Sequence, residues 1–202
     1  MKRTFLHVGC GNSRKNSTTP AFAGPEWEEI RLDINPDVHP DIVGTTTDMS
    51  MVESGSVDGL FSAHNIEHLY AHEVPQALRE FLRVLKPGGF AVITCPDLLP
   101  VAALIAADKL TDTAYISPAG PITPLDIVYG HRASVAAGNH YMAHKCGFTK
   151  KVLGATLMEC GFSHAATSER PAPFFDLWCV AIKGPMAEAD IRELATQHFP
   201  AS

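Results

Sequence analysis

The sequence has no long apolar run, so it offers no segment that could span a membrane. A spanning helix needs about 18 apolar residues, whereas the richest stretch, residues 98–107, is interrupted by Pro100. The apolar run behind Met1-Lys2-Arg3 already ends at His7, which is too short for the core of a signal peptide. We therefore expect a cytoplasmic protein with no membrane partner.

Paired cysteines and clusters of positive charge are also missing. The five cysteines are odd in number and none has Cys-x-x-Cys spacing, which disfavours a disulfide framework or a cysteine zinc cage. Net charge is −6, from 16 basic and 22 acidic residues, and no basic cluster exceeds two adjacent residues. Because nucleic-acid binding needs a positive surface, we expect no nucleic-acid partner, and a small-molecule partner is favoured instead.

What the chain does have is the length and composition of one globular domain. Its 202 residues are 46% hydrophobic and 19% charged, which excludes disorder, collagen and coiled coil. Short apolar runs alternate with segments of helical spacing. This pattern favours an α/β fold, with a Rossmann-like, mostly parallel seven-stranded sheet and helices on both faces. The expected strands are 4–8, 30–34, 41–44, 57–63, 90–95, 162–167 and 176–183, and the expected helices are 74–85, 149–160 and 187–198.

Residues 97–148 separate the fifth expected strand from the second expected helix. They are irregular and rich in Ala, Gly, Pro and His. A segment of this length is usually a lid or a binding loop rather than a plain connector. The sequence therefore predicts one domain over residues 1–202, with 97–148 as a lid that covers the acceptor.

Two features indicate a nucleotide-like ligand at the carboxyl end of the sheet. Gly9-Cys10-Gly11 follows the first expected strand, and its glycines let the backbone approach a ligand closely. Asp33 ends the next strand, 22 residues after Gly11, a spacing that suits an acid bound to a ribose diol. Arg14 replaces the third glycine of a dinucleotide motif, which disfavours a pyrophosphate ligand. Turn glycines and a solvated strand-end acid are the plainer alternative.

Four segments carry a family resemblance, and they occur in a fixed order along the chain. They are Leu6-His7-Val8-Gly9-Cys10-Gly11-Asn12, Arg31-Leu32-Asp33-Ile34-Asn35-Pro36, residues 56–69 and Phe81-Leu82-Arg83-Val84-Leu85-Lys86-Pro87-Gly88-Gly89. Together they resemble the class I S-adenosylmethionine-dependent methyltransferases, and among them the type 11 group. The resemblance covers about residues 4–97, with a weaker echo at 144–148 and 161–162. It implies S-adenosylmethionine as cofactor and methyl transfer as the reaction, and it leaves the acceptor open.

The resemblance also implies roles for single residues. The Gly9-Cys10-Gly11 turn would pass under the methionine part of the cofactor. Asp33 would hold both ribose hydroxyls, and Ile34 would pack against the adenine. His7 departs from the family, because many members carry an acid or asparagine there.

The adenine contact departs from the family pattern as well. In the family, the acid that meets the adenine amino group usually follows a glycine at the end of the third strand. Here Thr45 follows Gly44, so the resemblance assigns this contact to Asp48 with Met49. The residues that would line the sulfonium end of the cofactor are Ser62, Ala63 and His64.

Residues 64–68 also spell His-x-x-Glu-His, the inverted zinc-peptidase motif. A zinc site of this kind needs both histidines on one face of a helix, and His72 would extend that face. Here the motif directly follows an expected strand, in a chain short for such a peptidase. We therefore expect no metal, and histidines that pack the start of a helix are the plainer alternative.

Methyl transfer asks the protein to align two reactants and, for a hydroxyl or amine acceptor, to remove a proton. A histidine that titrates near neutrality suits the second task. His68 and His64 are the candidates beside the fourth strand, with His64 closer to the methyl group. His144 is the candidate in the lid, because it resembles a family position just before the Gly-Phe-Thr that opens the next helix. Other lid residues that could hold an acceptor, or simply satisfy loop backbone, are Tyr129, His131, Arg132, His140 and Tyr141.

Two other functional classes stay open at this stage. A protein that binds S-adenosylmethionine or S-adenosylhomocysteine without catalysis is favoured by the substitutions at His7 and Thr45. A nicotinamide-dependent oxidoreductase is disfavoured by the lost third glycine. Composition is compatible with either a monomer or a homodimer.

Overall fold

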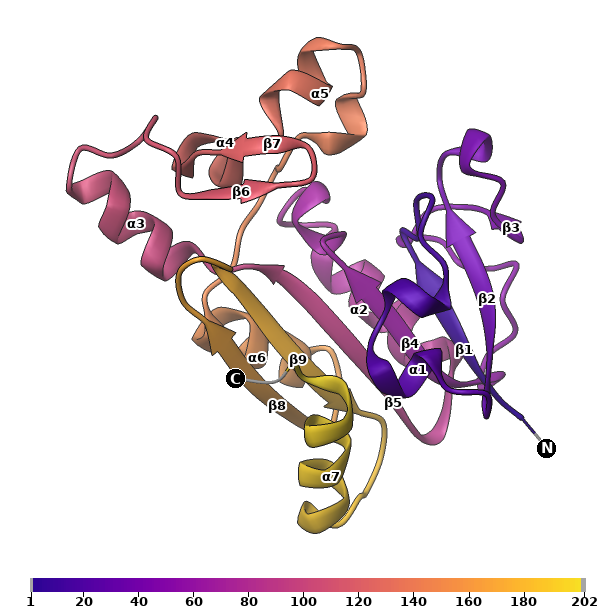
Figure 1. The fold of residues 1–202 in the computed structure, drawn as a ribbon. Helices are drawn as coiled ribbons and strands as arrows, with labels where there is room; N and C mark the ends of the chain where they lie inside the picture. The colour runs from indigo at the N-terminus through magenta and orange to yellow at the C-terminus, as the bar shows by residue number, and fades with distance from the viewer. Residues whose placement is uncertain (1, 201–202) are drawn as a thin grey trace.

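The computed structural model describes residues 2–200, and its centre is one seven-stranded sheet (Figure 1). The strands are β1 (Arg3–Val8), β2 (Trp27–Asp33), β3 (Ile42–Val43), β4 (Val57–Ala63), β5 (Leu85–Pro96), β8 (His164–Arg170) and β9 (Asp176–Ile182). Their spatial order is β3-β2-β1-β4-β5-β9-β8. The first five are parallel, and β9 runs antiparallel to both β5 and β8. The predicted mostly parallel, seven-stranded sheet is therefore confirmed.

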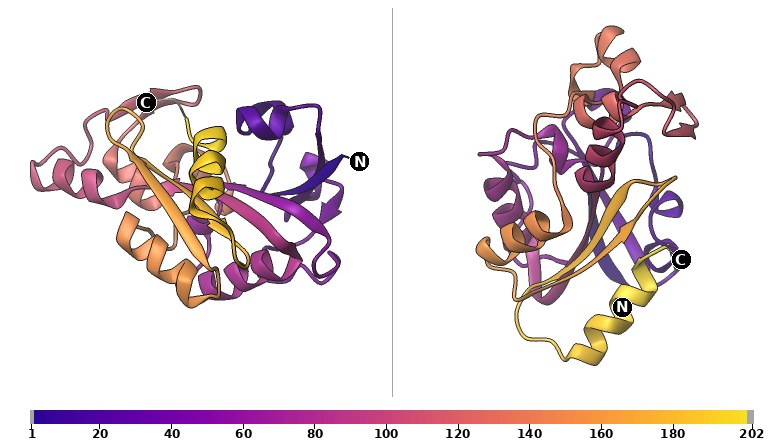
Figure 2. Two further views of the ribbon diagram at one scale, coloured as in Figure 1. Left: turned by 90° about the horizontal axis from the view of Figure 1, so that it is seen from below. Right: turned by 90° about the vertical axis from the view of Figure 1, so that its left-hand side faces the viewer.

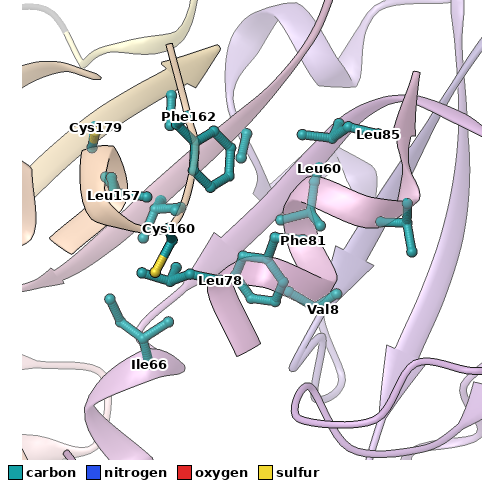
Figure 3. Close-up of a cluster of buried hydrophobic side chains, with 14 of the residues drawn as sticks. Val8, Leu60, Ile66, Leu78, Phe81, Leu85, Leu157, Cys160, Phe162 and Cys179 are labelled. Atoms are coloured by element: carbon teal, nitrogen blue, oxygen red, sulfur yellow. The ribbon is translucent and has the colours of Figure 1, made fainter. Parts of the chain in front are cut away.

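Helices cover both faces of the sheet, as predicted. Figure 2 (left) shows α2 (Val74–Val84) and α6 (Lys150–Glu159) below the sheet, and α1 (Pro20–Ala23) and α7 (Glu188–His198) above it. Successive strand residues point to opposite faces, so Leu6 and Leu60 belong to one buried cluster and Phe5 and Phe61 to the other. Figure 3 shows Phe81 and other residues of the first cluster.

The helix α2 forms because its apolar residues recur at helical spacing on the face that meets the sheet. It ends at Val84, one residue before the predicted end, and Leu85 already belongs to β5. Between β1 and β2 the chain makes only a 3-10 turn, η1 (Lys15–Ser17), and the four-residue α1. This agrees with the sequence, in which polar, Gly- and Pro-containing residues follow the glycine turn. No helix within residues 2–200 is long and apolar enough to cross a bilayer.

Residues 97–148 are more regular than the sequence indicates. They form α3 (Leu98–Ala106), the hairpin of β6 (Tyr115–Ser117) and β7 (Gly120–Ile122), α4 (Pro124–Tyr129), α5 (Arg132–Ala136) and the 3-10 turn η4 (His140–Met142) (Figure 1). Asp97 caps α3 by accepting the Leu99 N–H at 3.0 Å, and Pro100 lies in the first turn, where its missing N–H costs little. A small buried cluster, which includes Val101 and Phe175, holds these elements together. The expectation that residues 97–148 are irregular was wrong, because their apolar side chains form a small core that supports regular helices and a hairpin.

The contact between α7 and α1 predicts a pH dependence of stability. His198 is 1% exposed, and its Nδ1 lies 2.8 Å from Oγ1 of Thr19. Burial, with a smaller effect from Arg3, lowers the pKa of His198 from 6.5 to about 4. The unfolded chain therefore binds this proton below pH 6.5, and the folded chain binds it only below about 4. The free energy of unfolding should fall as the pH drops through this window, by about 3 kcal/mol from this group.

Urea unfolding at several pH values between 4 and 7.5 measures this effect. The His198→Gln variant should lose about 3 kcal/mol of the pH dependence in that window, while the part from other buried histidines such as His144 remains. The His164→Gln variant, at an exposed histidine, should keep the full pH dependence. Equal pH dependence in the His198→Gln variant and the unchanged protein would contradict the assignment.

Candidate active site

A cavity of about 490 Å³ lies at the carboxyl ends of β1, β2 and β4, and we call it the sheet-end cavity. In open α/β sheets this is where ligands bind. The glycine turn, the end of β2, the threonines after β3 and the loop after β4 all contribute to its wall. The residues with sequence-predicted roles that line it are Gly9, Gly11, Asp33, Ile34, His64, His68 and Tyr141.

The two glycines of the turn are needed for different reasons. Both have positive φ, 60° at Gly9 and 50° at Gly11. A Cβ at Gly9 would lie 1.9 Å from Nδ2 of Asn65, so the loop after β4 packs directly on this backbone. A Cβ at Gly11 would meet no protein atom within 4 Å. Gly11 therefore leaves open space at the cavity wall, which a ligand can approach.

Asp33 ties the glycine turn to the end of β2. Its Oδ2 accepts the Gly11 N–H at 2.7 Å, and its Oδ1 accepts the Asn35 N–H at 2.9 Å. Each carboxylate oxygen has a second lone pair, so the side chain can still accept two hydrogen bonds from a ligand. Next to it, Ile34 is 48% exposed and offers an apolar surface in the same cavity.

Arg31 organises the same loops, although no role for it was predicted from the sequence. Its side chain is 1% exposed, although it carries a charge. The guanidinium donates to the carbonyls of Gly11 and Ser13 after β1, and of Val38 and His39 after β2. It thus fixes both loops of the cavity wall to one rigid group. An arginine at an inward position of a predicted strand was the signal that could have indicated this.

Several residues with predicted cofactor contacts have side chains outside the sheet-end cavity. The side chains of Cys10, Ser62 and Met49 are at most 2% exposed, and Ala63 packs against the aromatic cluster around Phe61. His7 is also buried, with Nδ1 2.7 Å from Oε1 of Glu29.

The structure does not bring Asp48 to the sheet-end cavity either. The Asp48 N–H donates to the Thr45 carbonyl at 3.2 Å, which closes a tight turn and directs Asp48 away. Asp48 instead lines a separate open hollow with Gln76 and Arg83, and the residues that line the sheet-end cavity here are Thr45, Thr46 and Thr47.

A second cavity, of about 210 Å³, lies under the segment 97–148, and we call it the lid cavity. Apolar side chains such as Ile122 and Phe175 share its wall with polar ones such as Asp126. The wall is common to both cavities at three residues, which are His64, His68 and Met142. The two cavities therefore adjoin at these three residues.

Four ionisable side chains gather at this shared wall. His64 Nδ1 lies 3.2 Å from Oε1 of Glu67, and the centres of the His68 and His144 rings are 4.8 Å apart. His68 and His144 each hold one ring nitrogen, Nδ1, against a backbone carbonyl, Ala143 at 3.1 Å and Ile127 at 2.8 Å. His64, His68 and His144 are the three histidines that the sequence indicated as candidates, and the structure brings them close together. The structure adds Glu67, which stands out in the sequence only as part of the peptidase motif.

The local backbone explains why residues 64–68 do not build a peptidase site. They form a loop with the 3-10 turn η3 (Ile66–His68) rather than an α-helix, and His64 has φ 46°, in the left-handed region. Such a conformation costs about 1–3 kcal/mol and is common at functional sites. His72 lies apart, exposed and stacked on Tyr70.

The charges of this group follow from its burial and its neighbours. Burial acts to raise the pKa of Glu67, but His64 and then His68 outweigh it and hold this pKa below the ordinary value. The ion pair with Glu67 raises the pKa of His64, more than half of whose side chain is exposed. For His144, burial dominates and lowers the pKa. The site therefore combines an ionised carboxylate with a neutral His144 at neutral pH.

Comparisons with known proteins agree with this architecture. Residues 6–93 match a family model described as a methyltransferase domain. A search of curated proteins finds no significant match. The family-model match confirms the predicted resemblance over residues 6–93.

Solved structures share the fold at low sequence identity. The Burkholderia thailandensis 1,6-didemethyltoxoflavin-N1-methyltransferase, with 1,6-didemethyltoxoflavin and S-adenosylhomocysteine bound, is 15% identical with a TM-score of 0.59, over 91% of this chain and 72% of that one. A SAM-dependent methyltransferase from Methanosarcina mazei is 15% identical with a TM-score of 0.59, over 92% and 94%. One from Archaeoglobus fulgidus is 16% identical with a TM-score of 0.59, over 90% and 86%. The predicted fold class is confirmed.

Proposed function

We propose that this protein transfers a methyl group from S-adenosylmethionine in the sheet-end cavity to a small molecule in the lid cavity, because residues 6–93 match the model of a methyltransferase domain. The observation that supports this most is the shared wall at His64, His68 and Met142. Direct transfer needs the reacting atoms about 3–3.5 Å apart, and ligands in two adjoining cavities would meet at these residues. The Burkholderia structure, with a small molecule and S-adenosylhomocysteine bound together, is compatible with such a pair of sites.

The residues of the sheet-end cavity fit this cofactor. Asp33 keeps lone pairs for the two ribose hydroxyls, and the exposed face of Ile34 suits the adenine ring. In place of Asp48 and Met49, we assign the polar edge of the adenine to the threonines 45–47, which do line the cavity. The open space beside Gly11 suits the methionine part.

At the shared wall the cofactor, when bound, supplies the electrophilic methyl group. His68 is our first candidate for the group that removes a proton from the acceptor. Its Nδ1–H donates to the Ala143 carbonyl, so the other ring nitrogen, Nε2, carries a lone pair when the ring is neutral. His64, whose side chain is 54% exposed, and His144 are the other candidates.

The lid cavity indicates the size and character of the acceptor. Its volume, about 210 Å³, is below the 300–1,000 Å³ of most small-molecule sites, so the acceptor is small. Asp126 lines it as an anion: burial acts to raise its pKa, but Arg132 and Thr123 outweigh this and hold it far below the ordinary value. Polar groups among apolar ones fix a ligand's orientation.

All five cysteines are free, which suits a reducing compartment. We therefore propose that the protein is cytoplasmic and acts as a monomer or homodimer without a nucleic-acid partner.

A change in backbone at the cavity wall gives one test of the cofactor assignment. Gly11→Ala adds a methyl group in open space at φ 50°, so the free energy of unfolding should drop by only about 1–2 kcal/mol. The affinity for S-adenosylhomocysteine should drop about tenfold or more, because the methyl group occupies space that the ligand needs. Calorimetric titration measures the affinity.

The matched control is Gly88→Ala, at φ 77° with equally open surroundings but outside the cavity. It should have a similar backbone cost and unchanged affinity. If Gly11→Ala also binds S-adenosylhomocysteine with unchanged affinity, the ligand does not pass beside Gly11.

Two measurements separate the proposed function from its rivals. In a thermal-shift comparison, S-adenosylhomocysteine should stabilise the protein and NAD should not. A ligand at 100 times its dissociation constant adds about 2.7 kcal/mol. Incubation with methyl-labelled cofactor and a pool of small metabolites should then give a labelled small molecule. Stabilisation by NAD alone would favour an oxidoreductase, and cofactor binding without label transfer would favour a non-catalytic binding protein.

A further inference from the structure

Glu67, His68 and His144 form a group of metal-ligand type at the wall between the two cavities. One carboxylate oxygen of Glu67 and one ring nitrogen of each histidine all lie within 4.8 Å of one another. Glu67 and His68 come from the loop after β4, and His144 follows η4 at the end of the lid. The fold thus joins two segments that are 76 residues apart.

The two histidines are oriented as metal ligands usually are. His68 donates Nδ1–H to the Ala143 carbonyl and His144 donates Nδ1–H to the Ile127 carbonyl. A carbonyl can only accept, so these bonds fix the proton on Nδ1 and leave the lone pair of a neutral ring on Nε2. A metal-bound histidine almost always gives its other N–H to such a partner.

Glu67 has a carboxylate without enough donors. The residue is 1% exposed, and neither of its two carboxylate oxygens has a hydrogen-bond partner. His64 Nδ1, 3.2 Å from Oε1, is the one cationic contact, and no lysine or arginine of residues 2–200 pairs with Glu67. A buried carboxylate is costly unless it is paired or coordinates a metal. Oε2 of Glu67 has no partner among residues 2–200, so a cation held between this carboxylate and the two imidazoles would complete its contacts.

We propose that Glu67, His68 and His144 bind a divalent transition-metal ion of the zinc, iron or cobalt class. Two imidazoles and one carboxylate are a donor set of these metals, whereas Mg²⁺ and Ca²⁺ take mainly oxygen ligands. Three protein ligands leave at least one coordination position open, as in catalytic rather than structural sites. This proposal reverses the sequence expectation of no metal. That expectation concerned a helical zinc motif in which His64 and His72 would share a face with His68. In the site proposed here, His144 takes the place of His64 and His72 as the second histidine ligand.

The open position would point into the space where the acceptor binds, because His68 and His144 both line the lid cavity. An oxygen or nitrogen of the acceptor bound to the ion would lose its proton more easily. His68 would then act as a ligand, and the proton would pass to His64, which lines both cavities. This step rests on the proposed function, whereas binding of the ion does not.

Titration with Co²⁺ tests the site, because the bound ion has visible absorption bands that report its ligands. Chelator-treated protein should bind one Co²⁺ per chain with a spectrum typical of mixed nitrogen and oxygen ligands. The His144→Ala and Glu67→Gln variants should bind it at least about 100-fold more weakly, which exceeds the 10- to 100-fold effect of losing a supporting group. The matched control His72→Ala removes an exposed histidine outside the group and should bind Co²⁺ normally.

Binding of S-adenosylhomocysteine is measured on every variant as the check of folding and of the sheet-end cavity. If the unchanged protein binds S-adenosylhomocysteine but no Co²⁺, the metal site is refuted and the proposed function is not. The metal site is equally refuted if a folded His144→Ala or Glu67→Gln variant binds Co²⁺ as tightly as the unchanged protein. If the protein binds Co²⁺ but no S-adenosylhomocysteine, the proposed function falls and the metal site stands.

Discussion

Replacing His68 with alanine should lower the turnover of methyl transfer by about 10²- to 10⁴-fold, the usual contribution of a positioned acid or base. The ring lies on the wall shared by the two cavities, with Nδ1 fixed on the Ala143 carbonyl and Nε2 free to act. Removal of the ring takes away the proton acceptor, or the metal ligand if an ion is bound. The rate of label transfer to a confirmed acceptor, measured with saturating cofactor, reports the change.

The control for this variant is His72→Ala, four residues further along the same loop. His72 is exposed and lines neither cavity, so its loss should leave turnover unchanged. Both variants should bind S-adenosylhomocysteine, which shows that the loop is intact. A His68→Ala variant with normal turnover would remove His68 from the reaction.

Replacing Asp33 with alanine should weaken S-adenosylhomocysteine binding by about 100-fold or more. The variant loses two hydrogen bonds to the ribose hydroxyls, each worth about 1.5–3 kcal/mol with a charged acceptor, and 1.4 kcal/mol corresponds to a tenfold change. It also releases the Gly11 N–H, which Asp33 accepts at 2.7 Å, and so loosens the glycine turn. Calorimetric titration measures the dissociation constant.

The matched control is Asp37→Ala, which removes the same charge from an exposed position just after β2. Asp37 does not line the cavity, so affinity should stay within about threefold of the unchanged protein, or about 0.7 kcal/mol. An Asp33→Ala variant that keeps normal affinity while Asp37→Ala behaves as expected would rule out the ribose contact.

The glycine turn and the acid at the end of β2 were predictable as cavity residues, because their positions depend on the ends of neighbouring strands. In a parallel sheet the carboxyl ends of strands lie at one edge, so a glycine turn after one strand and an acid at the end of the next must meet. Gly9, Gly11, Asp33 and Ile34 all line the cavity as the sequence indicated. Their positions follow from local patterns that short segments encode.

The errors occur where a turn or strand phase decides the direction of a side chain. Asp48 directly follows the cavity residues 45–47 in the sequence, but the tight turn closed on the Thr45 carbonyl directs its side chain away from the cavity. Ser62 lies at the end of β4, and the alternation of that strand buries it completely. The helix α3 was not predicted, because its sequence contains Pro100. Proline breaks the interior of a helix, but it is tolerated in the first turn, where Pro100 lies.

The chemistry side depends on contacts that the sequence does not encode locally. Glu67 meets His144 only because the lid folds into helices and a hairpin and returns to the loop after β4. The Cys146 N–H and the Lys145 N–H both donate to the Glu67 carbonyl, which fixes this return. Such pairings require the tertiary structure, whereas the presence of three histidines was visible in the sequence.

Calorimetry of S-adenosylhomocysteine with ligand-free protein tests most directly whether the glycine turn and Asp33 form a cofactor site. We predict saturable binding of one molecule per chain, which the Asp33→Ala variant loses and the Asp37→Ala variant keeps. Absence of any binding heat at several temperatures, from a protein shown to be folded, would contradict the account.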